Sequence, residues 1–264
     1  MTWLLFAFAA GLGAVAVGMI GFGSSLVILP TLALVFPSMF APEVALRLAA
    51  GTTLATMTTG AVSAGIAQAR AGRVEWPLLR LAILPYLLGA LSGPWGARLL
   101  PVQALRLYIA GVLVLLGVWA WRSHRSTVVP GRMWQAHKAQ IVAVLFVIGF
   151  ASSAAGIASG VFAIPYLSRF ELPLRRVIGT STVAAAFYCM FGIVGYVSSG
   201  WGQEGLPAWS LGFVYLPAFG LMSIVGALCA PLGVRLAGRV SDSMLRRLVA
   251  IVLLTAAIAI ALRA

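Results

Sequence analysis

The 264-residue sequence contains very few charged side chains. Only 9% of its residues are charged, 62% are hydrophobic, and the mean hydropathy is +1.05. Because about a quarter of the residues in a soluble domain are charged, this chain cannot cover a water-exposed surface with polar groups. The composition predicts a helical integral membrane protein, and it argues against a disordered, fibrous or nucleic-acid-binding protein.

Acidic residues are the scarcest charged type, with five acids against 18 basic residues and a net charge of +13. None of the acids falls in the middle of an apolar segment, which argues against a carboxylate proton relay or cation site. The basic residues are spread singly between apolar runs. That pattern is typical of interfacial anchors and topology signals, and it would also attract an anionic solute. The acids are Glu43, Glu75, Glu171, Glu204 and Asp242.

Cysteine and histidine are also too few for most site chemistry. Cys189 and Cys229 both fall in apolar segments, and His124 and His137 share one polar stretch. No metal site can be assembled from this set, and no cofactor is predicted. Because no serine, cysteine or histidine stands beside a plausible catalytic partner, the sequence does not predict an enzyme.

Eight apolar segments are long enough to cross a bilayer, which takes about 20 residues. The first and fifth are too long for one crossing; the first would span roughly 51 Å as a helix. A break is predicted near Gly21, Gly23, Ser24 and Ser25, and another near Gly156, Ser159 and Gly160. The eight segments are Trp3–Phe36, Val44–Ala67, Leu78–Leu99, Leu105–Trp121, Ala139–Leu167, Val177–Ser198, Leu211–Leu236 and Leu245–Leu262.

The two halves of the chain repeat one another. The predicted division is a first transmembrane repeat at 1–122, a polar linker at 123–138 and a second repeat at 139–264. Residues 89–99 match 226–236 at seven of eleven positions, and two further motifs recur in the same order. Four crossings per half would give parallel repeats, whereas double crossing by each broken segment would give inverted ones. The basic residues favour neither orientation of the chain.

Two pairs of motifs could bind a solute. A helix break exposes backbone N–H groups at a half-helix N-terminus, which suits an anion; the alternative is close helix packing through small residues. The repeated Gly51-Thr52-Thr53 and Gly179-Thr180-Ser181 could add hydroxyl donors, or their hydroxyls could bond to the preceding turn. Arg47 and Arg175, each four residues after a glutamate, could collect anions at the pathway mouths or form helix-surface ion pairs.

These motifs resemble the TauE/SafE family of sulfite exporters. Members carry a glycine-rich segment followed by proline near the start of each half, matched here at 21–30 and 156–165. They also carry an A-x-G-T-S-like element, matched at 49–53 and 177–181. The resemblance implies transport of sulfite or an organosulfonate across a bacterial inner membrane, and it covers nearly the whole chain.

The sequence therefore predicts an all-α, polytopic membrane protein of about eight transmembrane segments. Its predicted function is that of a secondary transporter, which binds a small anionic solute between the two repeats and moves it by alternating access. It predicts a lipid bilayer as partner and no nucleic acid, and it leaves a homodimer open. The alternatives are a permease for a transition metal or another small solute, and a non-transport membrane subunit. The candidate substrate-binding residues are Gly21, Gly23, Ser24, Ser25, Thr52, Thr53, Gly156, Ser159, Gly160, Thr180 and Ser181.

Overall fold

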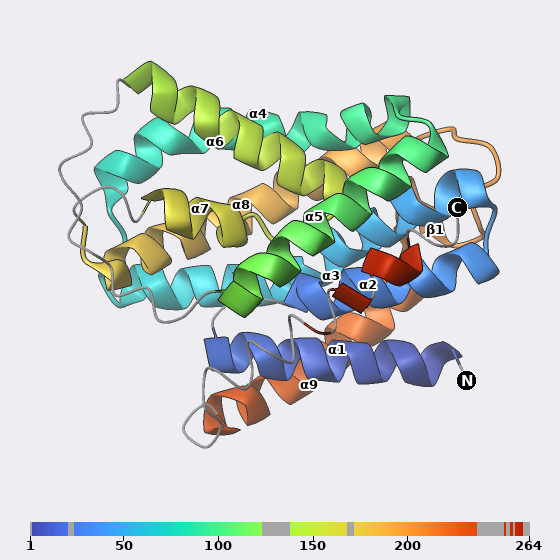
Figure 1. Ribbon diagram of the computed structural model, residues 1–264. Helices are drawn as coiled ribbons and strands as arrows, with labels where there is room; N and C mark the ends of the chain where they lie inside the picture. The colour runs from blue at the N-terminus through green and yellow to red at the C-terminus, as the bar shows by residue number, and fades with distance from the viewer. Residues whose placement is uncertain are drawn as a thin grey trace.

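The computed structural model describes residues 2–20, 24–122, 138–167 and 172–236, together with 251, 254, 255 and 257–260. Most of these residues are helical (Figure 1). The predicted linker and most of the segment Leu245–Leu262 lie outside them. The helices are α1 (Thr2–Ile20), α2 (Ser24–Val35), η1 (Phe36–Ser38), α3 (Pro42–Arg70), α4 (Trp76–Leu99), α5 (Val102–Arg122), α6 (Lys138–Ala155), α7 (Gly160–Leu167), α8 (Leu174–Gly200) and α9 (Leu216–Leu236).

Both overlong segments are interrupted at the predicted positions. Helix α1 ends at Ile20 and α2 begins at Ser24, while α6 ends at Ala155 and α7 begins at Gly160. Helix α2 turns back and packs along α1. As a result the ring of Phe36, just after α2, meets the ring of Phe6, near the start of α1, edge to face at 5.9 Å. At about 1.5 Å per residue, neither α2 nor α7 is long enough to cross a hydrocarbon core of about 30 Å by itself.

The centre of the molecule is the antiparallel pair of α3 and α8. Gly51, early in α3, lies against the Tyr196 ring near the end of α8, and Gly65 lies against Val183 near its start. Outward from this pair, α4 packs on α8 and α6 on α4, while α9 packs on α3 and α1 on α9. The contacts therefore run in the order α6, α4, α8, α3, α9, α1, and Figure 1 shows α4 with α6 and α1 with α9 as the two outer pairs.

The start of the central helix α3 follows from its sequence. Pro42 occupies its first turn, where proline's missing N–H is harmless and its fixed φ suits a helix. Glu43 in the first turn and Arg70 in the last turn complement the helix dipole. Sequence signals thus fix the ends of the helix that later positions the candidate site.

The prediction of an all-α chain needs one correction. Strands β1 (Ser210–Leu211) and β2 (Val214–Tyr215) form a short antiparallel hairpin. Gly212 has a φ of +54°, the positive value that the first central residue of a type II′ turn requires. Helix α9 therefore begins at Leu216, five residues after the predicted start of its apolar segment at Leu211, because the hairpin takes up the intervening residues.

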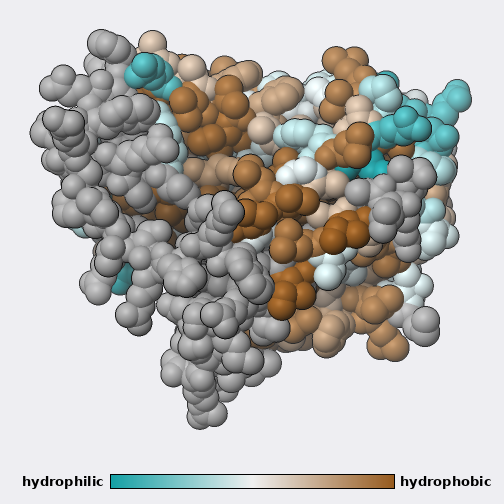
Figure 2. Space-filling model, in the orientation of Figure 1, coloured by the Kyte–Doolittle hydropathy of each residue, from teal (hydrophilic) through white to brown (hydrophobic). Residues whose placement is uncertain are grey.

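The surface of the helices is strongly apolar. Leu4 is 74% exposed and Leu228 72%, and Figure 2 shows apolar side chains gathered across the middle of one face, with hydrophilic ones toward its upper left and right edges. Among the described residues, two helical stretches are long and apolar enough to span a membrane, Trp76–Leu99 and Arg176–Gly200. At most half of each apolar window is buried, so these stretches present apolar surface that a bilayer would cover. The count of eight crossings stays a prediction.

Candidate functional site

The two helix breaks meet inside the molecule. Ser25 in the first turn of α2 accepts a hydrogen bond of 3.1 Å from the backbone N–H of Ala158, in the second break. Gly156 has a φ of +72°, and a Cβ there would collide with Ala50 of α3. Glycine is therefore needed both for the turn and for the close approach. The structure thus brings Ser24, Ser25, Ser159 and the two half-helices together, while Gly21 and Gly23 lie outside the described residues.

A cavity of about 90 Å³ lies beside the meeting point. One water needs roughly 10–15 Å³ by the same kind of measure, so the cavity has room for several waters or a small anion. Among the described residues that line it, none is charged. They are Ser24 of α2; Met57, Gly60, Ala61 and Ala64 of α3; Ala158; Gly160 and Ile164 of α7; and Ile178, Ser181, Thr182, Ala185, Tyr188 and Cys189 of α8.

Three buried hydroxyls at this place lack hydrogen-bond partners within the described part of the chain. They belong to Ser159, Ser181 and Tyr86. Ser181 lines the cavity and also a second one of about 20 Å³, which Tyr86 lines from α4. The hydroxyls of Tyr86 and Ser159 also lie close to one another. Because an unsatisfied buried polar group costs about 1–3 kcal/mol, three together indicate a place for a polar ligand.

The motif Gly51-Thr52-Thr53 has another role in the structure. The Thr52 hydroxyl accepts a 3.0 Å hydrogen bond from the backbone N–H of Tyr215, and a Cβ on Gly51 would collide with the carbonyl oxygen of Phe213. The Thr53 hydroxyl donates to the carbonyl of Ala49 in its own helix, at 2.7 Å. Thr52 and Gly51 thus dock the β2 segment onto α3, and none of the three residues lines the cavity.

The motif Gly179-Thr180 docks a second segment in the same way. The Thr180 hydroxyl accepts a 2.8 Å hydrogen bond from the backbone N–H of Glu75, and a Cβ on Gly179 would collide with the carbonyl oxygen of Arg73. In each case the connection that follows one central helix is held by the other central helix. We call these two arrangements the Thr52 clamp and the Thr180 clamp.

The two clamps lie at opposite ends of the α3–α8 pair. Thr52 is level with Tyr196, and roughly 24 Å of helix α8 separates Tyr196 from Thr180. The sequence predicts that both motifs surround one solute. The structure instead leaves only Ser181, from the second motif, facing the cavity between the half-helices, with Thr180 lining the smaller one.

The Arg47 side chain is hydrogen-bonded to the end of a neighbouring helix. Its guanidinium donates to the carbonyls of Ala97, Arg98 and Leu100 at the C-terminus of α4, at 2.9–3.3 Å. It also donates to the backbone carbonyl of Glu43, so the i,i+4 contact runs to the main chain rather than to the carboxylate. These bonds satisfy carbonyls that a helix end leaves free. The backbone of Arg175 lies in the first turn of α8, and its side chain is outside the described structure.

Sequence reasoning missed the residues that complete the cavity walls. Gly60 and Ala64 share one face of α3, a small-xxx-small spacing that could have indicated close packing there. Tyr188 lines the cavity and donates to the carbonyl of Ile157 in the second break, at 2.8 Å. Nothing in the sequence marked Tyr86 or Tyr188, because each is an aromatic residue in an apolar run.

A bundle of helices with a strongly apolar surface, in which two broken helices meet at a cavity, is typical of membrane transport proteins. The family described as "Sulfite exporter TauE/SafE" matches residues 5–260, and the chain belongs to that family.

Two relatives carry the name of probable membrane transporters. A probable membrane transporter protein of Haemophilus influenzae is 28% identical over 91% of each chain. A probable membrane transporter protein of Methanocaldococcus jannaschii is 21% identical over 86% of this chain and 83% of its own. No solved structure matches the chain.

Proposed function

We propose that the protein is a secondary transporter of a small sulfur oxyanion, such as sulfite or an organosulfonate. The anion binds in the cavity where the half-helices meet. Ser159 and Ser181 donate hydroxyl hydrogen bonds to it, and Gly160, the first residue of α7, lines the same cavity. Tyr86 contributes a third hydroxyl from α4.

The observation that carries this proposal is the unpaired buried hydroxyl of Ser181 in an uncharged cavity, with Tyr86 lining the adjoining smaller cavity and Ser159 between two residues that line the larger one. Hydroxyl and N–H donors can hold an anion without a buried cation, and each hydrogen bond to a charged group contributes about 1.5–3 kcal/mol. Neutral donors also allow release, because no buried ion pair has to be broken when the anion leaves.

The packing order supports alternating access between inverted repeats formed by residues 1–122 and 139–264. The repeated motifs pair α3 with α8, α4 with α9 and α1 with α6. Exchanging these partners reverses the order α6, α4, α8, α3, α9, α1 and leaves every contact in place. The antiparallel α3–α8 pair and the reversal at each break favour the inverted arrangement over the parallel one.

Export follows from the physics of the membrane potential. A negative-inside potential drives an anion outward by about 2.3 kcal/mol per charge per 100 mV. Among the described cavity-lining residues there is no carboxylate to carry a coupled proton, which fits a transporter driven by the charge of its solute.

Sulfite flux in proteoliposomes, with a potassium-diffusion potential of either sign, tests the proposal. We expect flux whose direction and rate follow the potential, and competition by organosulfonates. Protein that is folded by its thermal unfolding transition, yet moves neither sulfite nor any member of a sulfonate panel under either sign, would refute the function. Sulfite flux that does not depend on the membrane potential would refute the electrogenic mechanism.

A further inference from the structure

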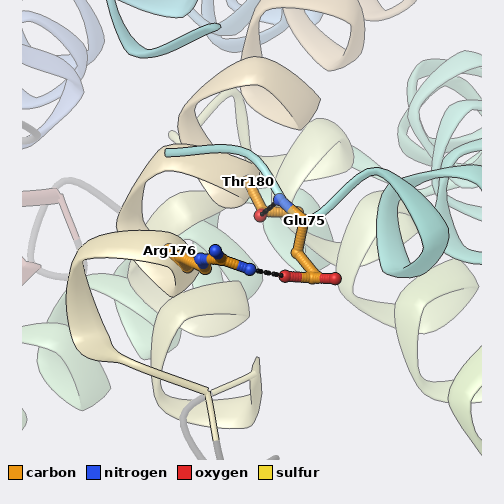
Figure 3. Close-up of polar contacts among 3 residues, drawn as sticks. All are labelled: Glu75, Arg176 and Thr180. Carbon is orange, nitrogen blue, oxygen red and sulfur yellow. Dashed lines mark hydrogen bonds and ion pairs between the residues drawn. The ribbon is translucent and has the colours of Figure 1, made fainter. Parts of the chain in front are cut away.

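The Thr180 clamp carries an ion pair. The Arg176 guanidinium of α8 contacts the Glu75 carboxylate at 2.8 Å, with side chains 53% and 22% exposed. Figure 3 shows that Glu75 makes both contacts, its backbone N–H reaching Thr180 and its carboxylate reaching Arg176. The backbone of Glu75 is therefore fixed, and its carboxylate is held beside the arginine.

Holding the segment does not require this ion pair. In the Thr52 clamp, Tyr215 takes the place of Glu75, and its ring packs edge-on against Phe36 and Phe40. The residue that matches Arg176 in the repeated motif is Leu48, which is fully buried. The same backbone docking is thus made with apolar side chains at one end and with a half-exposed ion pair at the other.

The ion pair also lies within about two helical turns of the cavity-lining residues. Ile178, two residues after Arg176 on α8, lines the cavity, and Ser181 follows within one further turn. Leu78 and Leu79, just after Glu75, line the smaller cavity on the α4 side. An anion moving along α8 toward the unpaired hydroxyls would meet Arg176 within about two turns of them.

We propose that Arg176 is an outer binding site for the transported oxyanion and that Glu75 is its built-in competitor. This inference rests on the proposed anion transport and adds the residue that captures the anion before it reaches Ser181. A guanidinium binds oxyanions through paired N–H groups, as it does a carboxylate. The incoming anion replaces the Glu75 carboxylate on Arg176, and the carboxylate returns when the anion moves inward.

Competition predicts opposite effects for the two partners. Glu75→Gln removes the competing charge and leaves Arg176 available, so the KM for sulfite falls by about 2- to 5-fold, the strength of a partly exposed ion pair. Arg176→Gln removes the site, and KM rises by about 10-fold. The double variant behaves as Arg176→Gln alone, because without the arginine there is nothing to compete for.

The experiment measures sulfite KM and kcat in proteoliposomes, and the shift of the thermal unfolding midpoint by sulfite in lipid nanodiscs. It compares the wild type, both single variants and the double variant. Glu204→Gln and Arg70→Gln serve as matched controls, since each removes one exposed charge outside the ion pair, and both are expected to keep the wild-type KM and sulfite shift. Arg176→Lys keeps the charge without the paired N–H geometry and is expected to fall between the wild type and Arg176→Gln.

A purely structural ion pair would move both single variants in the same direction, and that result, or no change in either, would overturn the inference. The nanodisc measurement decides the inference even if sulfite flux is absent. Opposite shifts of the sulfite effect in the two variants support it, while equal or absent shifts in all proteins overturn it. Absence of flux with opposite binding shifts would instead count against transport.

Discussion

Replacing Ser181 by alanine separates a binding role from a structural one. The Ser181 hydroxyl is buried without a hydrogen-bond partner among the described residues. Removing it therefore breaks no bond and relieves an unsatisfied group worth about 1–3 kcal/mol. We expect Ser181→Ala to leave the empty protein as stable as the wild type or more stable. If the hydroxyl binds the anion, the same change weakens binding by about 1.5–3 kcal/mol, or about 10- to 150-fold.

The assay pairs the thermal unfolding midpoint without ligand with the KM for sulfite in proteoliposomes. Ser153→Ala is the matched control, because that buried hydroxyl donates to the carbonyl of Ala90 at 2.7 Å. The loss of one hydrogen bond should lower the free energy of unfolding by about 0.6–2 kcal/mol. The unfolding midpoint should therefore fall, and KM should stay unchanged. A Ser181→Ala protein that is less stable and has an unchanged KM would refute the reasoning.

Three further substitutions test the structural assignments. Thr180→Val leaves the backbone N–H of Glu75 without its acceptor; we expect about 1–3 kcal/mol of lost stability, measured by thermal unfolding. Arg47→Gln removes the donors from the carbonyls at the end of α4, so the unfolding midpoint should fall while the sulfite KM stays the same, whereas an anion-collecting arginine would raise KM. Gly156→Ala combines a positive φ with a collision against Ala50, and we expect a loss of at least 1–3 kcal/mol in the same unfolding assay; wild-type stability would contradict the tight turn.

The sequence determined the class of the protein and the positions of its breaks. Low charge and long apolar runs leave a bilayer as the only suitable solvent, and this follows from composition without any knowledge of contacts. The first and fifth segments exceed the bilayer thickness, and small residues mark the points where Ser24 and Gly160 begin new helices. These features are local or additive, so one chain was enough to predict them.

The tertiary structure decided which of the predicted polar residues can reach a solute. Thr52 and Ser181 come from matching motifs, yet Thr52 accepts a backbone hydrogen bond at one end of α3–α8 while Ser181 has no partner at the cavity. Tyr86 joins Ser181 from another helix, and Arg47 is occupied by the end of α4. The sequence carries the donors and acceptors, but partners more than 50 residues away are chosen by helix packing. Sequence spacing therefore could not tell a docking threonine from a serine whose hydroxyl is left unpaired at the cavity.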